Sequence, residues 1–294
     1  MVLKKTAADR TFEVINVIIM LFLIAVTLYP FLYIIFASFS NSDDLIRHSG
    51  MLLYPLGINL NAYKMVFQNP NIFTGYGNTL IVLVVGTALN LLMTSFGAYV
   101  LSRNSFPCKR VILVLIVFTM YFQGGMIPRY LLIYDTLNLG DSLLALIIPQ
   151  AISTYNLIVM RTSFLGVPDS LEESAKIDGA NDFVILFRII LPVSMSVVAV
   201  MILFYGVTHW NAWFDAMIFL RDRKRYPLQL ILREILILNS TETMAVESAD
   251  VNNMAVGESI KYATIMVATL PVLAVYPFLQ KYFVKGVMIG AIKG

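Results

Sequence analysis

The stretch Leu171-Glu172-Glu173-Ser174-Ala175-Lys176-Ile177-Asp178-Gly179-Ala180 lies between two apolar segments, and Ile189-Ile190-Leu191-Pro192 follows it. The first stretch has the pattern of a short charged helix that ends at a glycine. An isolated helix of about two turns is marginal in water. We therefore expect another protein to hold this helix in place.

The rest of the chain has the composition of a membrane protein. Of its 294 residues, 59% are hydrophobic and only 13% are charged, and the mean hydropathy is +0.78. Soluble domains carry about 25% charged residues. So few charges cannot cover a water-facing surface, which predicts an all-α polytopic membrane protein. The net charge of +3 is small and the basic residues are scattered, so no nucleic-acid partner is expected.

The sequence offers few groups for chemistry. Cys108 is its only cysteine, and His48 and His209 are its only histidines, so we expect no metal site and no internal disulfide. It has no Gly-x-x-x-x-Gly-Lys-Ser/Thr phosphate loop, so the chain is not expected to bind ATP or another cofactor itself. We expect no catalytic residues and no enzymatic activity.

Six segments are long and apolar enough to be membrane spans. The first is interpreted as a retained helix, because it is too long for the apolar part of a signal peptide. Pro192 suits the first turn of the fifth span. A shorter apolar stretch, 228–238, contains Arg233 and Glu234 and is predicted to be interfacial or re-entrant. The predicted spans are Val14–Phe39, Thr79–Leu101, Val111–Phe122 with a broken end to Pro128, Leu143–Met160, Ile189–Val207 and Ala263–Leu279.

Six spans place both termini on one side of the membrane. Twelve of the 21 basic residues lie in the termini and in the second and fourth loops. Basic residues are enriched in cytoplasmic loops, so both termini are predicted to be cytoplasmic. The predicted organisation is a cytoplasmic N-terminus (1–13), a transmembrane domain (14–282) with a cytoplasmic loop at 161–188, and a cytoplasmic tail (283–294).

The short charged helix lies in this cytoplasmic loop. Ser170 and Glu173 have the spacing of a capping box, which predicts a helix start at Leu171, and Gly179 suits the left-handed residue that ends it. Leu171 and Ala175 form a small apolar face. One interpretation is a helix lying on the lipid surface. The acidic residues argue against this, because the inner leaflet is negative, and favour docking to a cytoplasmic protein.

These residues resemble a known family. Glu173-Ser174-Ala175, Gly179 and Ile189-Ile190-Leu191-Pro192 match the spacing of the Glu-Ala-Ala loop in permease subunits of bacterial ATP-binding-cassette (ABC) importers, with Ser174 where the family usually has alanine. Three more features resemble the carbohydrate-uptake, maltose-permease-like branch, and within it the polysaccharide-derived oligosaccharide group. They are Trp210-Asn211-x-x-Phe214, Tyr226-Pro227-Leu228 and the C-terminal stretch Lys285–Gly294.

The resemblance implies a type I ABC importer permease fold in the bacterial cytoplasmic membrane. It also implies three kinds of partner beside the lipid bilayer: a second homologous permease, two cytoplasmic ATPases that bind ATP and Mg, and an extracytoplasmic sugar-binding protein. ATP would drive alternating access of a sugar or oligosaccharide through the loop that the ATPases hold. By their match to the family pattern, two groups of residues are expected to contact the ATPases. The coupling residues are Leu171, Glu172, Glu173, Ala175, Asp178, Gly179 and Pro192, and the C-terminal contact is at Lys293 and Gly294.

Polar and aromatic residues at membrane depth are candidates for the substrate pathway. They are Asn90, Thr94, Ser95, Tyr155, Asn156 and Tyr205. The alternative is that they hold helices together, as Ser, Thr and Asn commonly do in membranes. The sequence leaves open which sugar is carried and whether it is acidic. The basic cluster Arg221–Arg225 suits an acidic sugar, but a solvated loop explains it as well.

The sequence is less compatible with two other functions. An ion-coupled secondary carrier generally places charged groups inside its spans, and the central parts of these spans have none. A membrane-embedded enzyme would need a polar catalytic cluster within the spans, and none is visible in the sequence.

Overall fold

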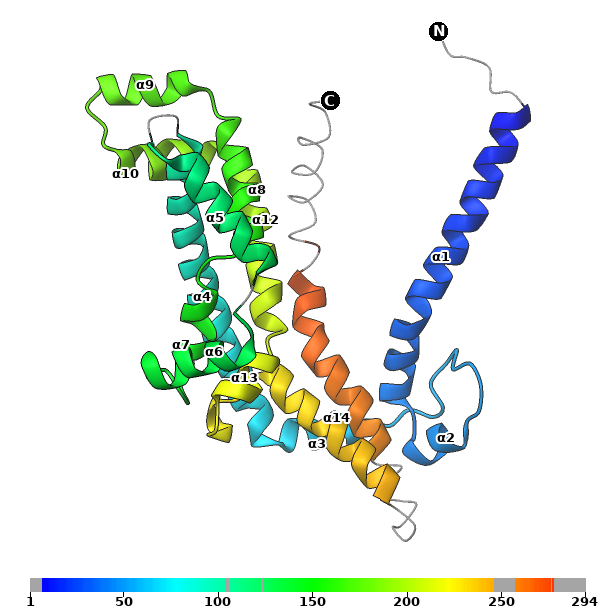
Figure 1. Cartoon of the computed structure of the whole chain (residues 1–294). Helices are drawn as coiled ribbons and strands as arrows, with labels where there is room; N and C mark the ends of the chain where they lie inside the picture. Colours follow the sequence, from blue (N-terminus) through cyan, green and yellow to red (C-terminus); the bar gives the residue numbers. More distant parts are fainter. Residues whose placement is uncertain (1–6, 104–105, 123, 246–256, 276, 278–294) are drawn as a thin grey trace. The chain divides into compact units, whose positions relative to one another are not determined.

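The helices of the chain fall into two units, which are described separately. A computed structural model describes residues 7–103, 106–122, 124–245, 257–275 and 277, and within these ranges every regular element is a helix (Figure 1). Unit 1 comprises residues 1–69 and 234–270, and unit 2 comprises residues 70–233 and 271–294. The predicted C-terminal contact at Lys293 and Gly294 lies outside the described residues.

Unit 1 begins with a long, exposed helix. Helix α1 (Ala7–Phe39) contains an 18-residue apolar window in which no residue is buried, so its surface suits lipid or a protein neighbour. The chain after it folds back onto its end. The backbone N–H of Asn59 donates to the carbonyl of Phe39 at 2.9 Å, and that of Leu56 donates to Ser40 Oγ at 3.0 Å. Two short helices belong to this loop: α2 (Ser42–Arg47) and α3 (Asn61–Gln68).

Unit 2 holds most of the other helices. Its elements are α4 (Pro70–Ser102), α5 (Lys109–Tyr121), α6 (Met126–Leu131), η1 (Leu132–Thr136), α7 (Leu144–Ile147), η2 (Ile148–Gln150), α8 (Thr154–Leu165), α9 (Asp169–Ile177), α10 (Asp182–Ile185), η3 (Leu186–Ile190), α11 (Leu191–Val193), α12 (Met195–Trp210), α13 (Phe214–Phe219) and η4 (Arg223–Arg225). Two further helices have residues in both units, α14 (Leu228–Ala245) and Gly257–Val275.

Helix α4 is the centre of unit 2, and α8 and α12 pack against it. Its residues Ala98 and Tyr99 share a buried cluster with Leu157 of α8 and Tyr205 of α12. Gly97 lets α8 approach closely, since a Cβ at this position would lie 2.9 Å from a methyl group of Leu157. This packing fixes the positions from which α4 presents its polar side chains.

The six predicted spans correspond to three unbroken helices and three bent pairs. Among the described residues, α1, α4 and Gly257–Val275 are each long and apolar enough to cross a membrane, and the total is six if each bent pair is one span. The fourth span is interrupted, because α7–η2 and α8 meet at a 49° bend. The second starts earlier than predicted, at Pro70. Helix α14 is longer than predicted, with 18 residues.

Pro192 lies in the first turn of the short helix α11, which confirms the predicted first-turn position. The fifth span corresponds to a bent pair, in which Asp182–Val193 comes before an 88° bend and α12 (Met195–Trp210) comes after it. The π-helical turn η3 directly precedes α11. Proline gives no N–H to a helix, and the wider π turn accommodates the resulting gap in the hydrogen-bond ladder.

Candidate functional site

Helix α9 carries the charged stretch, and it begins two residues earlier than predicted. It runs from Asp169 to Ile177 and follows Pro168, whose extended conformation (ψ 133°) turns the chain into the helix. The capping-box prediction was therefore wrong. Ser170 lies inside the helix, where its carbonyl accepts a 2.8 Å hydrogen bond from Ser174 Oγ.

The end of α9 confirms the predicted glycine stop. Gly179 has a φ of +81°, in the left-handed region that favours glycine. The N–H of Gly179 donates to the carbonyl of Lys176 at 3.0 Å, and the N–H of Ala180 donates to that of Ala175 at 2.9 Å. This pair of bonds is the Schellman motif, which satisfies carbonyl groups that the helix end would leave unpaired.

Glu172 points into the protein rather than outward. Glu172 is only 8% exposed, and each of its carboxylate oxygens has a charged partner. Oε2 lies 2.5 Å from Arg103 Nη1, and Oε1 lies 2.7 Å from Lys176 Nζ. The hydrogen bond to Glu172 raises the pKa of Lys176. Glu172 lies on the same face of α9 as Ala175, three residues on, and this face is the buried one.

Arg103, at the end of α4, was missed by the sequence analysis. Its guanidinium stacks on the Tyr99 ring at 5.0 Å, and its Nε donates to Ser102 Oγ at 3.2 Å. The Tyr99 hydroxyl in turn donates to Asp182 Oδ1 of α10 at 3.3 Å. The end of α4 thus contacts both α9 and α10. Because Arg103 and Glu172 are 69 residues apart, no local pattern could have paired them.

The predicted coupling residues divide into an exposed and a buried group. Ala175 is buried with Glu172 and belongs to the cluster that includes Ile185. Ile177, which the prediction did not include, is 86% exposed. A Cβ added at Gly179 would meet no atom of the chain within 4 Å. Pro192 lies apart in α11 and is exposed, as are the coupling residues of α9 and its C-terminal end that face outward, Leu171, Glu173, Asp178 and Gly179.

Three of the predicted substrate-pathway residues, Asn90, Thr94 and Tyr205, lie beside the break between η2 and α8. Asn90 Nδ2 donates to the carbonyl of Gln150 at 2.5 Å, and Tyr205 OH accepts from the N–H of Ser153 at 3.2 Å. Thr94 Oγ1 lies 2.7 Å from the same hydroxyl. A broken helix frees backbone groups that must be paired at membrane depth. These side chains from α4 and α12 supply the missing partners.

The remaining pathway candidates have different surroundings. Ser95 Oγ contacts Met160 Sδ at 3.7 Å. The N–H of Asn156 donates to Ser153 Oγ, which caps α8. Tyr155 is 54% exposed and lies beside Phe204. The geometry therefore fits the alternative in which most of these residues hold helices together, and a substrate role stays a prediction.

His209 belongs to the same polar group. Its Nε2 lies 2.6 Å from Asn90 Oδ1, and the ring is 2% exposed. Gly86 makes room for it, because a Cβ there would lie 2.6 Å from Nε2. Asn90 therefore bonds both the helix break and α12.

Asp215 of α13 is a second buried acidic residue of unit 2. Its Oδ2 lies 2.7 Å from Arg129 Nη2 and accepts from Gln150 Nε2 at 2.5 Å. Gln150 thus connects the break to an ion pair through its side chain, while its carbonyl is held by Asn90. The aromatic face of Phe219 lies 5.8 Å from the Arg129 guanidinium.

The basic cluster Arg221–Arg225 has a defined conformation. Asp141 Oδ1 accepts from the backbone N–H groups of Arg221 and Asp222, both at 3.0 Å, and Oδ2 lies 2.8 Å from Arg225 Nη1. These backbone bonds, with the nearby arginines, lower the pKa of Asp141. Asn78 of α4 holds the same segment through the carbonyls of Lys224 and Tyr226.

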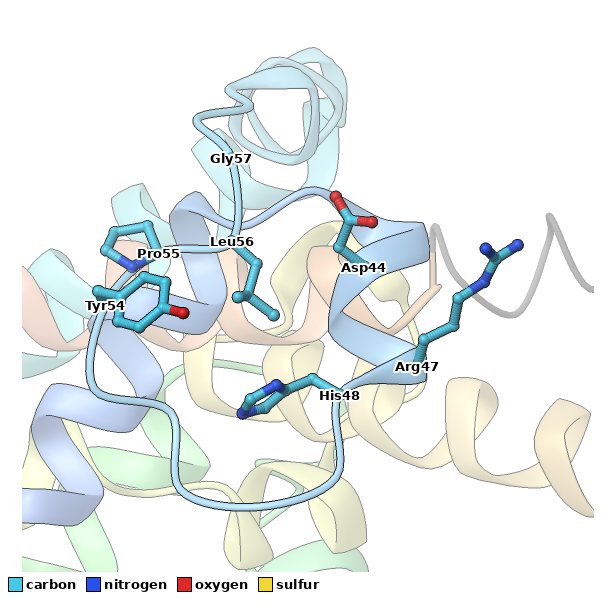
Figure 2. A pocket seen from close by; sticks show the side chains of 7 residues that line it. All are labelled: Asp44, Arg47, His48, Tyr54, Pro55, Leu56 and Gly57. Atoms are coloured by element: carbon cyan, nitrogen blue, oxygen red, sulfur yellow. The ribbon is translucent and has the colours of Figure 1, made fainter.

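Unit 1 contains a separate cavity of about 420 Å³ in the loop after α1 (Figure 2). Tyr54 and Pro55 lie on one side of it and Asp44 and Arg47 on the other, with His48 at one end. His48 Nε2 lies 3.3 Å from the carbonyl of Met51. In the described part of the chain, no three His, Cys, Asp or Glu residues come together in a way that could hold a metal ion.

Comparisons with known proteins agree on one family. The model of the family "Binding-protein-dependent transport system inner membrane component" matches residues 105–289. Protein LplC of Bacillus subtilis (strain 168) is 42% identical over 98% of this chain and 97% of its own length. The polygalacturonan/rhamnogalacturonan transport system permease protein YtcP of the same organism is 40% identical over 97% and 99%.

A solved structure is similar over nearly the whole chain. It is a chain of a bacterial ABC transporter involved in the import of the acidic polysaccharide alginate, with a TM-score of 0.86 and 31% sequence identity. The match covers 96% of this chain and 100% of that one. The fold of this chain is therefore similar to that of a chain of an ABC importer.

Proposed function

We propose that this chain, which belongs to the family of binding-protein-dependent transport system inner membrane components, is the permease subunit through which an ATP-driven importer moves an oligosaccharide across the bacterial cytoplasmic membrane. It is a transport component and not an enzyme. Family membership does not support the ion-coupled carrier that the sequence left open.

The observation that carries the proposal is the two-sided character of α9. One face is fixed to the end of α4 through Glu172, while Glu173, Ile177 and Asp178 are exposed. Such a helix suits a docking contact that must bear force. The proposed assembly contains a second homologous permease, two cytoplasmic ATPases that bind ATP and Mg, and an extracytoplasmic sugar-binding protein, with both termini of this chain in the cytoplasm.

We propose an acidic oligosaccharide as the cargo. The names of one relative and one solved structure refer to polygalacturonan/rhamnogalacturonan and to alginate. The ordered basic cluster Arg221–Arg225 would attract such a substrate electrostatically. A neutral sugar would gain nothing from this cluster.

Vesicles that contain the complete importer test the proposal. With the binding protein outside and ATP inside, a labelled oligogalacturonide should accumulate in the vesicles, and a neutral oligosaccharide of equal length should accumulate far more slowly. Uptake without ATP, driven by a proton or sodium gradient, would contradict the importer function. Equal uptake of both sugars would contradict only the acidic cargo.

A further inference from the structure

We propose that Arg103 is a positioning residue that makes α9 and the end of α4 move as one body, so that force applied to α9 reaches the helix break at residues 151–153. The inference rests on the proposed function, because the ATPases supply the force. It assigns to Arg103 a role in coupling rather than in binding sugar or ATP.

The first step is the contact itself. Arg103 and Glu172 are 9% and 8% exposed, and Arg103 Nη1 lies 2.5 Å from Glu172 Oε2. Separating two buried opposite charges is costly in free energy, because each would be left without a counterion and away from water. Arg103 Nη2 has no acceptor among the described residues, and Asp169 lies farther away, at 3.9 Å. Glu172 is therefore the main anchor of this guanidinium.

The second step is that α9 could rotate relative to its neighbours if this contact were absent. The helix is joined to α8 through Gly166, Val167 and Pro168, and to α10 through the left-handed Gly179. Neither connection is helical, so α9 could pivot on both when a partner pushes its exposed face. The ion pair removes this freedom, since it lies on the opposite, buried face.

The third step is the route through α4. From Ser102 back to Thr94 the helix is continuous over eight residues, which is about 12 Å at the rise of an α-helix. Thr94 and Asn90 bond Tyr205 and the carbonyl of Gln150 beside the break. Figure 1 shows α9 and α10 at one end of α4, with α7 beside its other half. A displacement of the end of α4 therefore acts directly on the interrupted span.

The experiment measures coupling in the complete importer, reconstituted in vesicles with its binding protein. Arg103→Met and Glu172→Gln each remove one charge from the pair, and Arg103→Lys keeps a cation there. Arg110→Met removes an exposed cation from the start of α5, seven residues along the chain, and is the matched control. For each assembly, ATP hydrolysis and uptake of a labelled oligogalacturonide are measured together, after co-purification has shown that the subunits assemble.

We expect the amount of sugar moved per ATP hydrolysed to fall at least about tenfold in Arg103→Met and Glu172→Gln, with ATP hydrolysis retained. Arg103→Lys should recover part of the coupling, and Arg110→Met should equal the wild type.

Two results would overturn the inference. One is wild-type coupling in assembled Arg103→Met. The other is failure of all three pair variants to assemble, which would show a structural role only. A wild-type importer that hydrolyses ATP and moves no oligosaccharide would contradict the proposed function instead, so the two failures are distinguishable.

Discussion

The two polar regions of α4 differ in charge. At its end, Arg103 contacts Glu172 through an ion pair, whereas in its middle Asn90 and Thr94 make neutral hydrogen bonds. Charged groups are costly inside a membrane, but neutral amides and hydroxyls are enough to pair single backbone groups of a broken helix. Helix α4 itself has no charged side chain, and charge enters only at its end, where a partner is proposed to dock.

The largest expected effect concerns α9, the helix that contacts the charged end of α4. Gly179→Asp should abolish sugar uptake while the protein stays in the membrane, because the change strains a residue at φ +81° and adds a side chain to the exposed surface. The measurement is ATP-driven uptake in reconstituted vesicles.

Gly179→Asn and Gly179→Ala separate the causes. Asparagine has nearly the size of aspartate without its charge and visits the left-handed region as aspartate does, whereas alanine adds only a Cβ. If uptake returns in Gly179→Asn, the negative charge is the cause. If Gly179→Asn is inactive and Gly179→Ala is active, the longer side chain obstructs the docked partner, and if all three variants are inactive, backbone strain is the cause. Wild-type uptake in Gly179→Asp would contradict a coupling role for the end of α9.

The next effect concerns the neutral middle of α4. Asn90→Leu should lower the free energy of unfolding by at least about 2 kcal/mol, because it leaves the Gln150 carbonyl and His209 Nε2 without their partner. Thermal unfolding in detergent measures the loss. Leu92→Ile, at an exposed position of the same helix, should change stability by less than about 0.5 kcal/mol. Equal stability of the two variants would show that the break does not depend on Asn90.

A smaller effect on stability distinguishes a hydrogen bond between two helices from a hydrogen bond within one helix. Thr94→Val should cost about 1 kcal/mol, because it removes the contact with the Tyr205 hydroxyl. Thr119→Val is the matched control, since its exposed hydroxyl donates to the carbonyl of Ile116 in its own helix. Detergent unfolding curves of the two variants should differ by this amount, and coincident curves would argue against a stabilising contact between α4 and α12.

The smallest effect concerns the loop that Asp141 organises. Its lowered pKa means that it stabilises the loop fully above the ordinary value of 3.8, and that this contribution is lost as the pH falls through the lower value of the folded protein. Amide hydrogen exchange at Arg221 and Asp222, expressed as protection relative to free peptide at each pH, should decrease over that acidic range. Asp141→Asn should show the reduced protection already at about pH 7, and unchanged protection in this variant would exclude the role of the carboxylate.

Much of this architecture is readable from local patterns. The apolar runs predict α1 and α4, and Gly179 predicts the end of α9, because span length and the left-handed cap depend on residues close together in the chain. The Glu-Ala-Ala spacing indicates the family for the same reason. A local pattern failed where one residue type fits two positions. Serine suits a helix N-cap, but Ser170 lies within α9, because the helix begins at Asp169, directly after Pro168.

Long-range packing settled the features that no local pattern contains. Three features depend on contacts of α4 with elements far along the chain. They are the choice of the buried face of α9, the pairing of Glu172 with Arg103, and the hydrogen bonds of Asn90 and Tyr205 at the helix break. Composition determines that these helices enter a membrane, because transfer of apolar side chains from water depends on each segment alone. Which polar groups become partners depends on the folded arrangement, because a hydrogen bond or ion pair forms only between atoms brought within about 3 Å of each other.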